Sequence, residues 1–410
     1  MNILNNISRR LTFQPGYIIL VSLLCVVTSV NAADDTYKFI VFGDFNGGDC
    51  SRNERVQKSI NAMAKEKGIA FYVSTGDLID GYVNNNATMC FASDPVKKIP
   101  DIKPCGPGIN NGNVAEMVAP LKSRKPVQGL KSSFYPVIGN HDDNWGSSWY
   151  PDPCGDGICD FLAPQTPDTF INHDHGDMCS KDQGSSSHSR DFYYSFTYKN
   201  SYFIILRINN DDWTMFSACN NHPGFKNCAD YCTAPELKGN SERADNCWGG
   251  VEQYDWLVDE LKKAQKYDNI FVFTHAVALG SGDGHLPFAG AGKLRQLLEK
   301  YNVDIFINGH NHFYQRTKKV MGGDDRGNGG RVDEHGVIYL TVGSAGAEFD
   351  AANPHVWFNA KTAYDWTKYG QPDWKDKMTT YTIISVNGKK VKGNTKSIAI
   401  KGSVDTFKIK

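Results

Sequence analysis

Acidic, amide and imidazole side chains follow short apolar runs at five places in this chain, in turns of the Gly-Asp, Gly-Asn-His, Thr-His and Gly-His type. The residues are Asp44, Asp77, Asn140, His275, and the pair His310 and His312. One such turn alone is common in proteins, but five at strand ends in a single chain favour a shared site over unrelated turns. Carboxylates, an amide oxygen and neutral imidazoles form a ligand set for two first-row metal ions. The pattern therefore predicts a dinuclear metal centre in which one carboxylate bridges both ions.

The elements that must position these side chains are short runs rich in β-branched and aromatic residues. They span 38–43, 69–74, 134–138, 270–273 and 303–307. Apolar runs of this length are typical of strands buried on both faces of a sheet, and ligands of open α/β sheets gather at the carboxyl ends of such strands. Glycine directly precedes the candidate ligand at four of the five turns, and we expect it to let the chain turn sharply off its strand.

Helical patterns separate the strands. Apolar residues recur on one face at Val56, Ile60 and Met63, at Leu257, Leu261 and Ala264, and at Leu294, Leu297, Leu298 and Tyr301. Alternating strands and helices predict an α/β fold with helices packed on a sheet.

The chain end follows a different pattern and predicts β strands within 378–410. The expected strands are 380–386 and 389–392, joined at Asn387-Gly388, followed by 397–400 and 406–409. Segments 83–118 and 143–190 are rich in Gly, Asn, Asp, Ser and Pro, which indicates loop insertions. We therefore expect a single domain over 33–410.

The first 32 residues have the order of a secretory signal peptide. Arg9 and Arg10 precede the apolar run 17–30, which is followed by Asn31 and Ala32. That run falls short of the ~20 residues that span a bilayer, so we expect no stable membrane insertion. Cleavage after Ala32 would place the mature chain outside the cell or in a periplasm.

Ten of the 11 cysteines follow residue 32, and an even number of cysteines in an exported chain predicts up to five disulfides. A zinc cluster is the alternative, with Cys154 and Cys159 or Cys228 and Cys232 as pairs. Neither pair has the two-residue gap of a zinc knuckle, so disulfides are favoured.

The charge balance argues against nucleic acid as a partner. Lys and Arg number 44 and Asp and Glu 45, and loss of Arg9 and Arg10 would leave 42 against 45. Binding to a phosphate backbone needs clustered cations, which near-neutral charge does not suggest. The oligomeric state is left open.

The five turns, in this order, closely resemble the sequence blocks of the calcineurin-like metallophosphoesterase superfamily. Further segments resemble its connecting elements, including Tyr194-Ser195-Phe196, His312-Phe313-Tyr314-Gln315-Arg316 and 402–407. Within the superfamily the chain is most similar to the small, tartrate-resistant branch of purple acid phosphatases. The resemblance implies a four-layer α/β/β/α sandwich with mixed sheets.

Carried over by position, the resemblance makes Asp77 the bridging carboxylate. It assigns Asp44 and His312 to one metal ion, and Asn140, His275 and His310 to the other. His141 would lie beside the leaving group without binding metal, and Asp142 would orient it. His285 lies near the expected opening of the site and is left outside the assigned set.

Two positions depart from the family pattern. Asp80 occupies the place of the tyrosine that ligates iron in purple acid phosphatases, and Tyr82 is two residues too far along. Asn46 occupies the place of a histidine that the wider superfamily uses. The fourth ligand of the first metal is thus Asn46 oxygen, Asp80 or water, and we expect no tyrosinate charge-transfer band.

The favoured function is a secreted acid phosphatase that hydrolyses small phosphate monoesters with two metal ions, which O and N ligands allow to be Fe, Zn or Mn. Hydroxide supplied at the metals would attack phosphorus, and His141 would act as general acid. One alternative is a phosphodiesterase acting on nucleotides or phospholipid head groups, because the same centre serves both reactions. A third hypothesis is a metal-binding protein whose catalysis has weakened.

Overall fold

The computed structural model describes residues 35–45, 50–78, 121, 133–140, 193–208, 241–282, 285–288, 290–324, 326–350, 352–353, 355–362 and 374–410. At 50–54, 241–252, 362 and 374 it describes the backbone only. All of these residues belong to one unit, Asp35–Lys410. The expected signal peptide, the two loop insertions and the cysteine side chains lie outside the described residues, so these expectations and the domain boundaries stay predictions.

The first sheet contains six strands in the order β14-β13-β12-β1-β2-β3. Its parallel part is formed by β1 (Thr36–Phe42), β2 (Ile69–Ser74) and β3 (Phe134–Tyr135). The antiparallel part is formed by β12 (Thr380–Asn387), β13 (Lys390–Ser397) and β14 (Ser403–Lys408). Chain start and chain end therefore meet in one mixed sheet, with β1 hydrogen-bonded to β12.

The second sheet has the order β11-β8-β10-β7-β6-β5-β4, with β9 paired to β8. Four strands of this sheet run parallel to one another: β5, β6, β7 and β10. The other four pair antiparallel with their neighbours: β4, β8, β9 and β11. The bounds are β4 Tyr194–Tyr198, β5 Ser201–Ile205, β6 Asn269–Phe273, β7 Ile305–Asn308, β8 Tyr314–Met321, β9 Arg331–Val332, β10 Val337–Val342 and β11 Asn359–Thr362.

The sheets pack face to face over an aromatic core. Phe39 contacts Phe271 edge to face at 5.3 Å between ring centroids, and Phe71 contacts Phe203 in the same way at 5.3 Å. These rings join strands of the first sheet to strands of the second, so burial of large aromatic surface fixes how the two sheets face one another.

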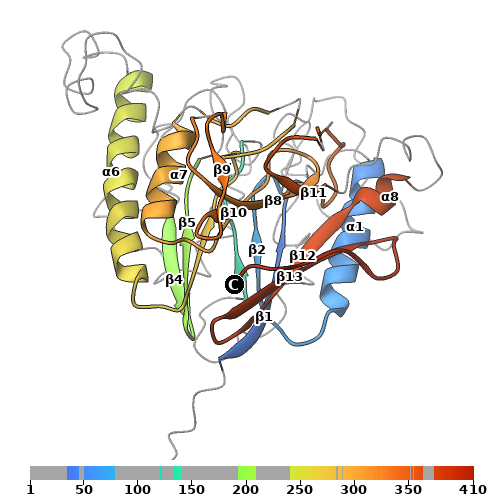
Figure 1. Ribbon diagram of the computed structural model, residues 1–410. Helices are drawn as coiled ribbons and strands as arrows, with labels where there is room; N and C mark the ends of the chain where they lie inside the picture. The colour runs from blue at the N-terminus through green and yellow to red at the C-terminus, as the bar shows by residue number, and fades with distance from the viewer. Residues whose placement is uncertain are drawn as a thin grey trace, which may run out of the picture. The chain divides into compact units, whose positions relative to one another are not determined.

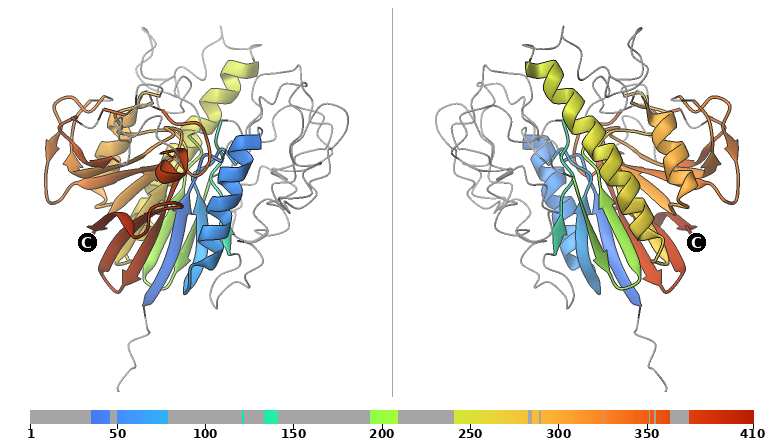
Figure 2. Two further views of the ribbon diagram at one scale, coloured as in Figure 1. Left: turned by 90° about the vertical axis from the view of Figure 1, so that its right-hand side faces the viewer. Right: turned by 90° about the vertical axis from the view of Figure 1, so that its left-hand side faces the viewer.

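Helices cover the outer faces of both sheets (Figures 1 and 2). Helix α1 (Cys50–Lys65) packs on the first sheet, while α6 (Ser241–Ala264) and α7 (Ala291–Lys300) pack on the second. A short helix, α8 (Trp374–Met378), precedes β12. The expected four-layer α/β/β/α arrangement with C-terminal β strands is confirmed. Within the described part of the chain, no helix has the length and apolar character required to cross a bilayer.

Several of the expected strands differ from the structure: β13 continues to Ser397 instead of ending at 392, and β14 begins at Ser403 instead of 406. Segment 397–400 was expected to be a strand, but it leaves β13 in a turn because Ser397 Oγ accepts the backbone N–H groups of Ala399 and Ile400. Strand β3 ends at Tyr135 instead of continuing to 138, since Pro136 has no N–H to donate. The helical patterns at Val56, Leu257 and Leu294 fall within α1, α6 and α7 as expected.

Candidate metal centre

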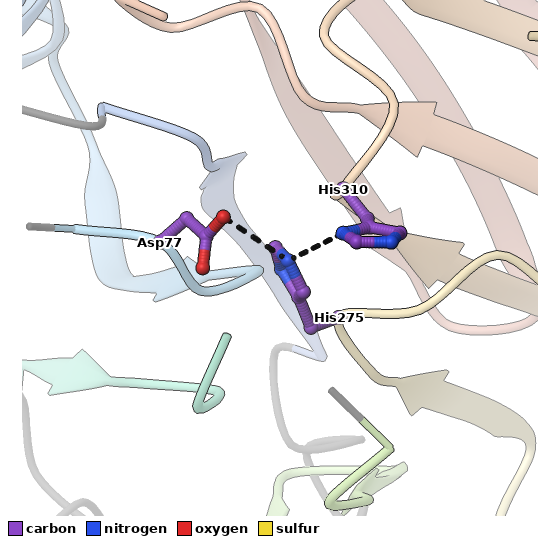
Figure 3. Close-up of side chains that lie close together, drawn as sticks. All are labelled: Asp77, His275 and His310. Carbon is purple, nitrogen blue, oxygen red and sulfur yellow. Dashed lines mark hydrogen bonds and ion pairs between the residues drawn. The ribbon is translucent and has the colours of Figure 1, made fainter. Parts of the chain in front are cut away.

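The candidate ligands lie at the carboxyl ends of parallel strands from both sheets. Asp44 and Asp77 follow β1 and β2, and Asn140 follows β3 in the first sheet. His275 and His310 follow β6 and β7 in the second sheet. Figure 3 shows Asp77 approaching His275 and His310 from the opposite sheet. Residues as far apart in sequence as Asp44 and His312 therefore meet because the two sheets place the carboxyl ends of these strands together.

The first ligand group is centred on His275. One ligand atom each from Asp77, His275 and His310 lies within 4.8 Å of the others. His275 Nε2 is 3.3 Å from Asp77 Oδ2 and 3.1 Å from His310 Nδ1. The same nitrogen is 2.9 Å from Asn140 Oδ1. The structure thus brings together the four residues assigned to the second metal, counting the bridging carboxylate.

The contact at Nδ1 of His275 determines which ring nitrogen can bind a metal ion. Nδ1 lies 2.7 Å from the carbonyl oxygen of Thr75, which can only accept a hydrogen bond. Nδ1 therefore carries a proton, and in a neutral ring Nε2 presents its lone pair to Asp77, His310 and Asn140. Metal-binding histidines are commonly oriented by such a contact at the second nitrogen.

The second ligand group contains Asp44, Asp77 and His312, with one atom each within 4.8 Å of the others. His312 Nε2 is 3.6 Å from Asp44 Oδ1. Asp77 belongs to both groups, which is the geometry that a bridging carboxylate requires. The His312 side chain is 16% exposed while that of Asp44 is fully buried, so the centre is more open on the His312 side.

Three of the candidate ligands have an unusual backbone conformation. Asp44, Asp77 and His310 have φ values of 59°, 52° and 68°, in the left-handed region that non-glycine residues rarely adopt. Such strain of about 1–3 kcal/mol per residue persists where surrounding structure enforces it, and it is concentrated at functional sites.

The preceding glycines are explained mainly by close approach. A Cβ on Gly139 would lie 2.0 Å from Asp77 Oδ1, and one on Gly309 would lie 2.3 Å from Asp44 Oδ2. Any larger residue would displace a candidate ligand. The expectation that these glycines serve the turn is thus refined: among them Gly76 has a positive φ, of 96°, while Gly139 and Gly309 provide space.

Burial and mutual charge shift the protonation of these groups. Burial raises the pKa of Asp44 well above its usual value, and the negative charge of Asp77 acts in the same direction, opposed by His275. For His275, burial alone would lower the pKa, but Asp77 and Asp44 outweigh it and raise that pKa to about 10. A cluster of buried carboxylates and imidazoles thus retains protons that metal ions would replace.

The residues present fit the two metal ions that the resemblance implies. Asp44 Oδ2 is buried and has no hydrogen-bond partner among the described residues, although its companion Oδ1 accepts the His310 N–H at 2.8 Å. An uncompensated buried carboxylate oxygen is costly unless a cation binds it. Asp44 therefore presents a buried oxygen that is available to a metal ion.

Two residues outside the ligand assignment also contact the centre. The His285 ring lies 3.9 Å from that of His310 and 6.5 Å from that of His312, measured between centroids. Asp350 Oδ2 accepts the backbone N–H of His312 at 2.8 Å. The sequence does give a signal for His285, because this residue lies between β6 and α7, near the expected opening of the site. No local pattern points to Asp350, which is brought to His312 by the loop after β10.

Asn46, Asp80, His141 and Asp142 lie outside the described residues. The fourth ligand of the first metal and the role of His141 therefore stay predictions.

A family model for calcineurin-like phosphoesterases matches residues 37–314. The chain belongs to the calcineurin-like phosphoesterase family. All six of the ligand candidates fall within the matched segment. An uncharacterized protein of Mycobacterium tuberculosis is 27% identical over 297 residues, which cover 66% of this chain and 48% of the relative. The chain thus spans about half the length of this relative.

Purple acid phosphatases are also similar to this member of the calcineurin-like family. Purple acid phosphatase 18 of Arabidopsis thaliana is 30% identical over 99 residues, covering 23% of this chain and 21% of that protein. The structure of a purple acid phosphatase from yellow lupin seeds aligns with a TM-score of 0.53 and 17% identity. That alignment covers 92% of this chain and 54% of the lupin chain, and it shows the fold. Together with the family match, these similarities support the general class of metal-dependent phosphoesterases.

Proposed function

We propose that this protein hydrolyses small phosphate monoesters at a dinuclear metal centre, as acid phosphatases do. The observation that carries the proposal is the pair of ligand groups that share Asp77. A centre of two ions bridged by one carboxylate suits in-line displacement at phosphorus, because both the attacking and the leaving oxygens can be stabilised.

The side chains of this chain would divide the work as follows. Asp77 would bridge, Asp44 and His312 would hold one ion, and Asn140, His275 and His310 the other. When bound, the ions supply a water of lowered pKa and neutralise charge on the phosphoryl oxygens; the donor set accepts Fe, Zn or Mn. Asp350 holds the backbone of His312 in place.

Two histidines would act on the substrate instead of the metals. His141, protonated and oriented by Asp142, would donate its proton to the departing alkoxide as the bond between phosphorus and the leaving oxygen breaks. His285 lies against His310 and would contact the phosphoryl group from the side near His312.

Replacement of His141 tests this division of roles. We expect His141→Ala to lower kcat on an ester with a poor leaving group by about 10²- to 10⁴-fold while bound metal, measured by mass spectrometry, stays at the wild-type level. His335→Ala, at a side chain that is 78% exposed, is the matched control and should leave kcat unchanged. Loss of metal from His141→Ala, or an unchanged rate, would contradict the role of proton donor.

A phosphodiesterase is the second candidate, and Asp80 favours it. The absence of tyrosine at that position agrees better with the wider superfamily than with purple acid phosphatases. Turnover of p-nitrophenyl phosphate and of its bis ester by the metal-loaded protein separates the two candidates. A higher kcat/KM for the monoester supports the acid phosphatase proposal, and the opposite preference replaces it. Full metal occupancy without turnover of either ester would favour the metal-binding protein.

We further propose that the protein is exported and disulfide-bonded. The leader pattern of residues 1–32 and the even number of cysteines after it support this proposal. Counting free thiols in the denatured protein without reductant tests the second part. Several free thiols would contradict it.

A further inference from the structure

A row of lysines crosses the outer face of the first sheet, away from the metal centre. Lys38 on β1 pairs with Ser385 on β12, Ser385 pairs with Lys392 on β13, and Lys392 pairs with Lys408 on β14. Lys390 lies two residues before Lys392 on β13. We call Lys38, Lys390, Lys392 and Lys408 the lysine row. All four side chains are exposed.

The register places the whole row on one face. Residues directly opposite in neighbouring strands point to the same side of a sheet, and residues two apart on one strand do so as well. The alternate positions face the other way: Phe39 contacts Phe271 of the second sheet, and the Phe407 ring lies against Arg316 of the second sheet. Val391, between Lys390 and Lys392, is buried. The lysine row therefore lies on the α1 side of the sheet, where β13 and β14 extend beyond α1 (Figure 2).

The charges of the lysine row are not neutralised within the described part of the chain. Neighbouring cations do have partners: Lys396 pairs with Glu66 at 2.6 Å, and Lys410 pairs with Asp304 at 3.1 Å. The nearby carboxylate of Asp405 is directed to the other face, where it binds Arg316 at 2.7 Å. By contrast, no described carboxylate lies within ion-pair distance of any lysine in the row.

This arrangement costs stability in the free protein. Lys392 and Lys408 are directly opposite, and like charges at such a position repel across a Cβ separation of about 5 Å. An anion bound across both strands would remove that repulsion. The row thus has the charge pattern of a binding surface for an extended anion.

We propose that the lysine row binds a linear anionic polysaccharide, with charges repeated along the chain as carboxylates or sulfates. The polymer would cross β1, β12, β13 and β14, and Lys38 and Lys392, two strands apart, would contact anions about 10 Å from one another. Ser385 lies between Lys38 and Lys392, and Asn387 and Thr406 lie on the same face beside the row; all three offer hydrogen bonds to sugar hydroxyls.

The composition of this face separates a polysaccharide from other polyanions. Single-stranded nucleic acid is bound through aromatic side chains that stack on bases, and neither the lysine row nor the three polar residues beside it include an aromatic side chain. A lipid surface usually takes up apolar side chains alongside basic ones, and these positions are polar throughout. Hydroxyl and amide groups between ammonium groups instead match a hydroxylated, charged polymer.

The position of the row would leave the metal centre accessible. Lys38 lies six residues before Asp44, so about 20 Å of strand separates the row from the first candidate ligand. The polymer would thus hold the protein without occupying the centre. Binding and hydrolysis should therefore vary independently.

The test compares two triple variants of equal charge. Lys38→Gln/Lys392→Gln/Lys408→Gln removes three charges of the row. Lys266→Gln/Lys293→Gln/Lys361→Gln removes three exposed lysines outside it, which have no ion pair with any described carboxylate. Titration calorimetry of the full chain at 50 mM salt would use polygalacturonate, dextran sulfate, neutral dextran, oligo-dT and phosphatidylserine vesicles.

We expect the row variant to bind the charged polysaccharides roughly 10- to 100-fold more weakly than wild type, because each lysine contributes electrostatic affinity at low salt. The control variant should bind within twofold of wild type, and neutral dextran should not bind. Preference for polygalacturonate or for dextran sulfate identifies the anionic group. Both variants should keep the wild-type melting temperature within a few degrees and the wild-type turnover of p-nitrophenyl phosphate.

Equal loss of affinity in both variants, or no loss in the row variant, would overturn the proposal. Tighter binding of oligo-dT or of the vesicles than of either polysaccharide would assign the row to a different partner and would also overturn it.

Discussion

His275 is the central side chain of the first ligand group. Its Nδ1 donates to the Thr75 carbonyl, and its Nε2 meets Asp77, His310 and Asn140. The carboxylates of Asp77 and Asp44 outweigh burial and raise the pKa of His275 to about 10. Without metal the ring is therefore protonated at neutral pH, and a metal ion must displace the proton at Nε2.

This competition predicts proton release on metal binding. Since the raised pKa keeps His275 charged below about pH 10, binding at pH 8 should release one proton from this ring, and apparent affinity should rise as pH increases toward 10. Calorimetry of Zn²⁺ binding to metal-free protein in two buffers of different ionisation enthalpy measures the number. Identical heats in both buffers would show that His275 is already neutral.

At the level of elements, the turns after β1, β2, β3 and β7 are shaped around the ligands they carry. Gly309 lies at the end of β7 because any Cβ there would come within 2.3 Å of Asp44 Oδ2. Gly388, in the hairpin between β12 and β13, has φ of 57° and open space around it. One glycine is required by contact and the other by backbone conformation.

Alanine at these two positions should separate the two requirements. Gly309→Ala should lose at least half of the bound metal and most of the turnover, because Asp44 must move. Gly388→Ala should cost about 1–2 kcal/mol of unfolding free energy and keep its metal, because only a left-handed backbone is strained. Metal analysis and urea unfolding measure both. Full metal occupancy in Gly309→Ala would mean that the turn relaxes without moving Asp44.

The same turns explain how much the sequence could predict. The sequence allowed prediction of these candidate ligands because each lies within about five residues of the end of an apolar strand, at the carboxyl edge of a sheet: Asp44, Asp77, Asn140, His275, His310 and His312. Asp350 was not predictable, since its approach to His312 depends on the path of the loop after β10. Sheet order was equally out of reach, because the pairing of β1 with β12 joins residues about 350 positions apart.

For the molecule as a whole, a charged contact that is mostly shielded from solvent links the two sheets. Arg316 on β8 binds Asp405 on β14 at 2.7 Å, and the Tyr314 hydroxyl donates to the same carboxylate at 2.8 Å. Side-chain exposure is only 16% for Arg316 and 9% for Asp405. Tyr314 begins the strand that directly follows the loop carrying His310 and His312.

Removal of this carboxylate should destabilise the fold. We expect Asp405→Ala to lower the free energy of unfolding by about 3 kcal/mol, because it leaves Arg316 and Tyr314 without their shared acceptor. Asp259→Ala, which removes a surface pair with Lys262, is the control and should change it by less than about 0.5 kcal/mol. Chemical denaturation of the metal-loaded proteins makes the comparison. Equal values for the two variants would show that the contact between sheets contributes nothing net.

The ligands come from opposite sheets, Asp44, Asp77 and Asn140 from one, His275, His310 and His312 from the other. Each bound ion would therefore also cross-link the two sheets at the carboxyl ends of these strands, in addition to its role in hydrolysis. Treatment with a chelator should lower the melting temperature and speed amide hydrogen exchange first in the turns after β2, β6 and β7, ahead of the aromatic interior. Loss of metal would then make this protein more susceptible to proteolysis as well as inactive.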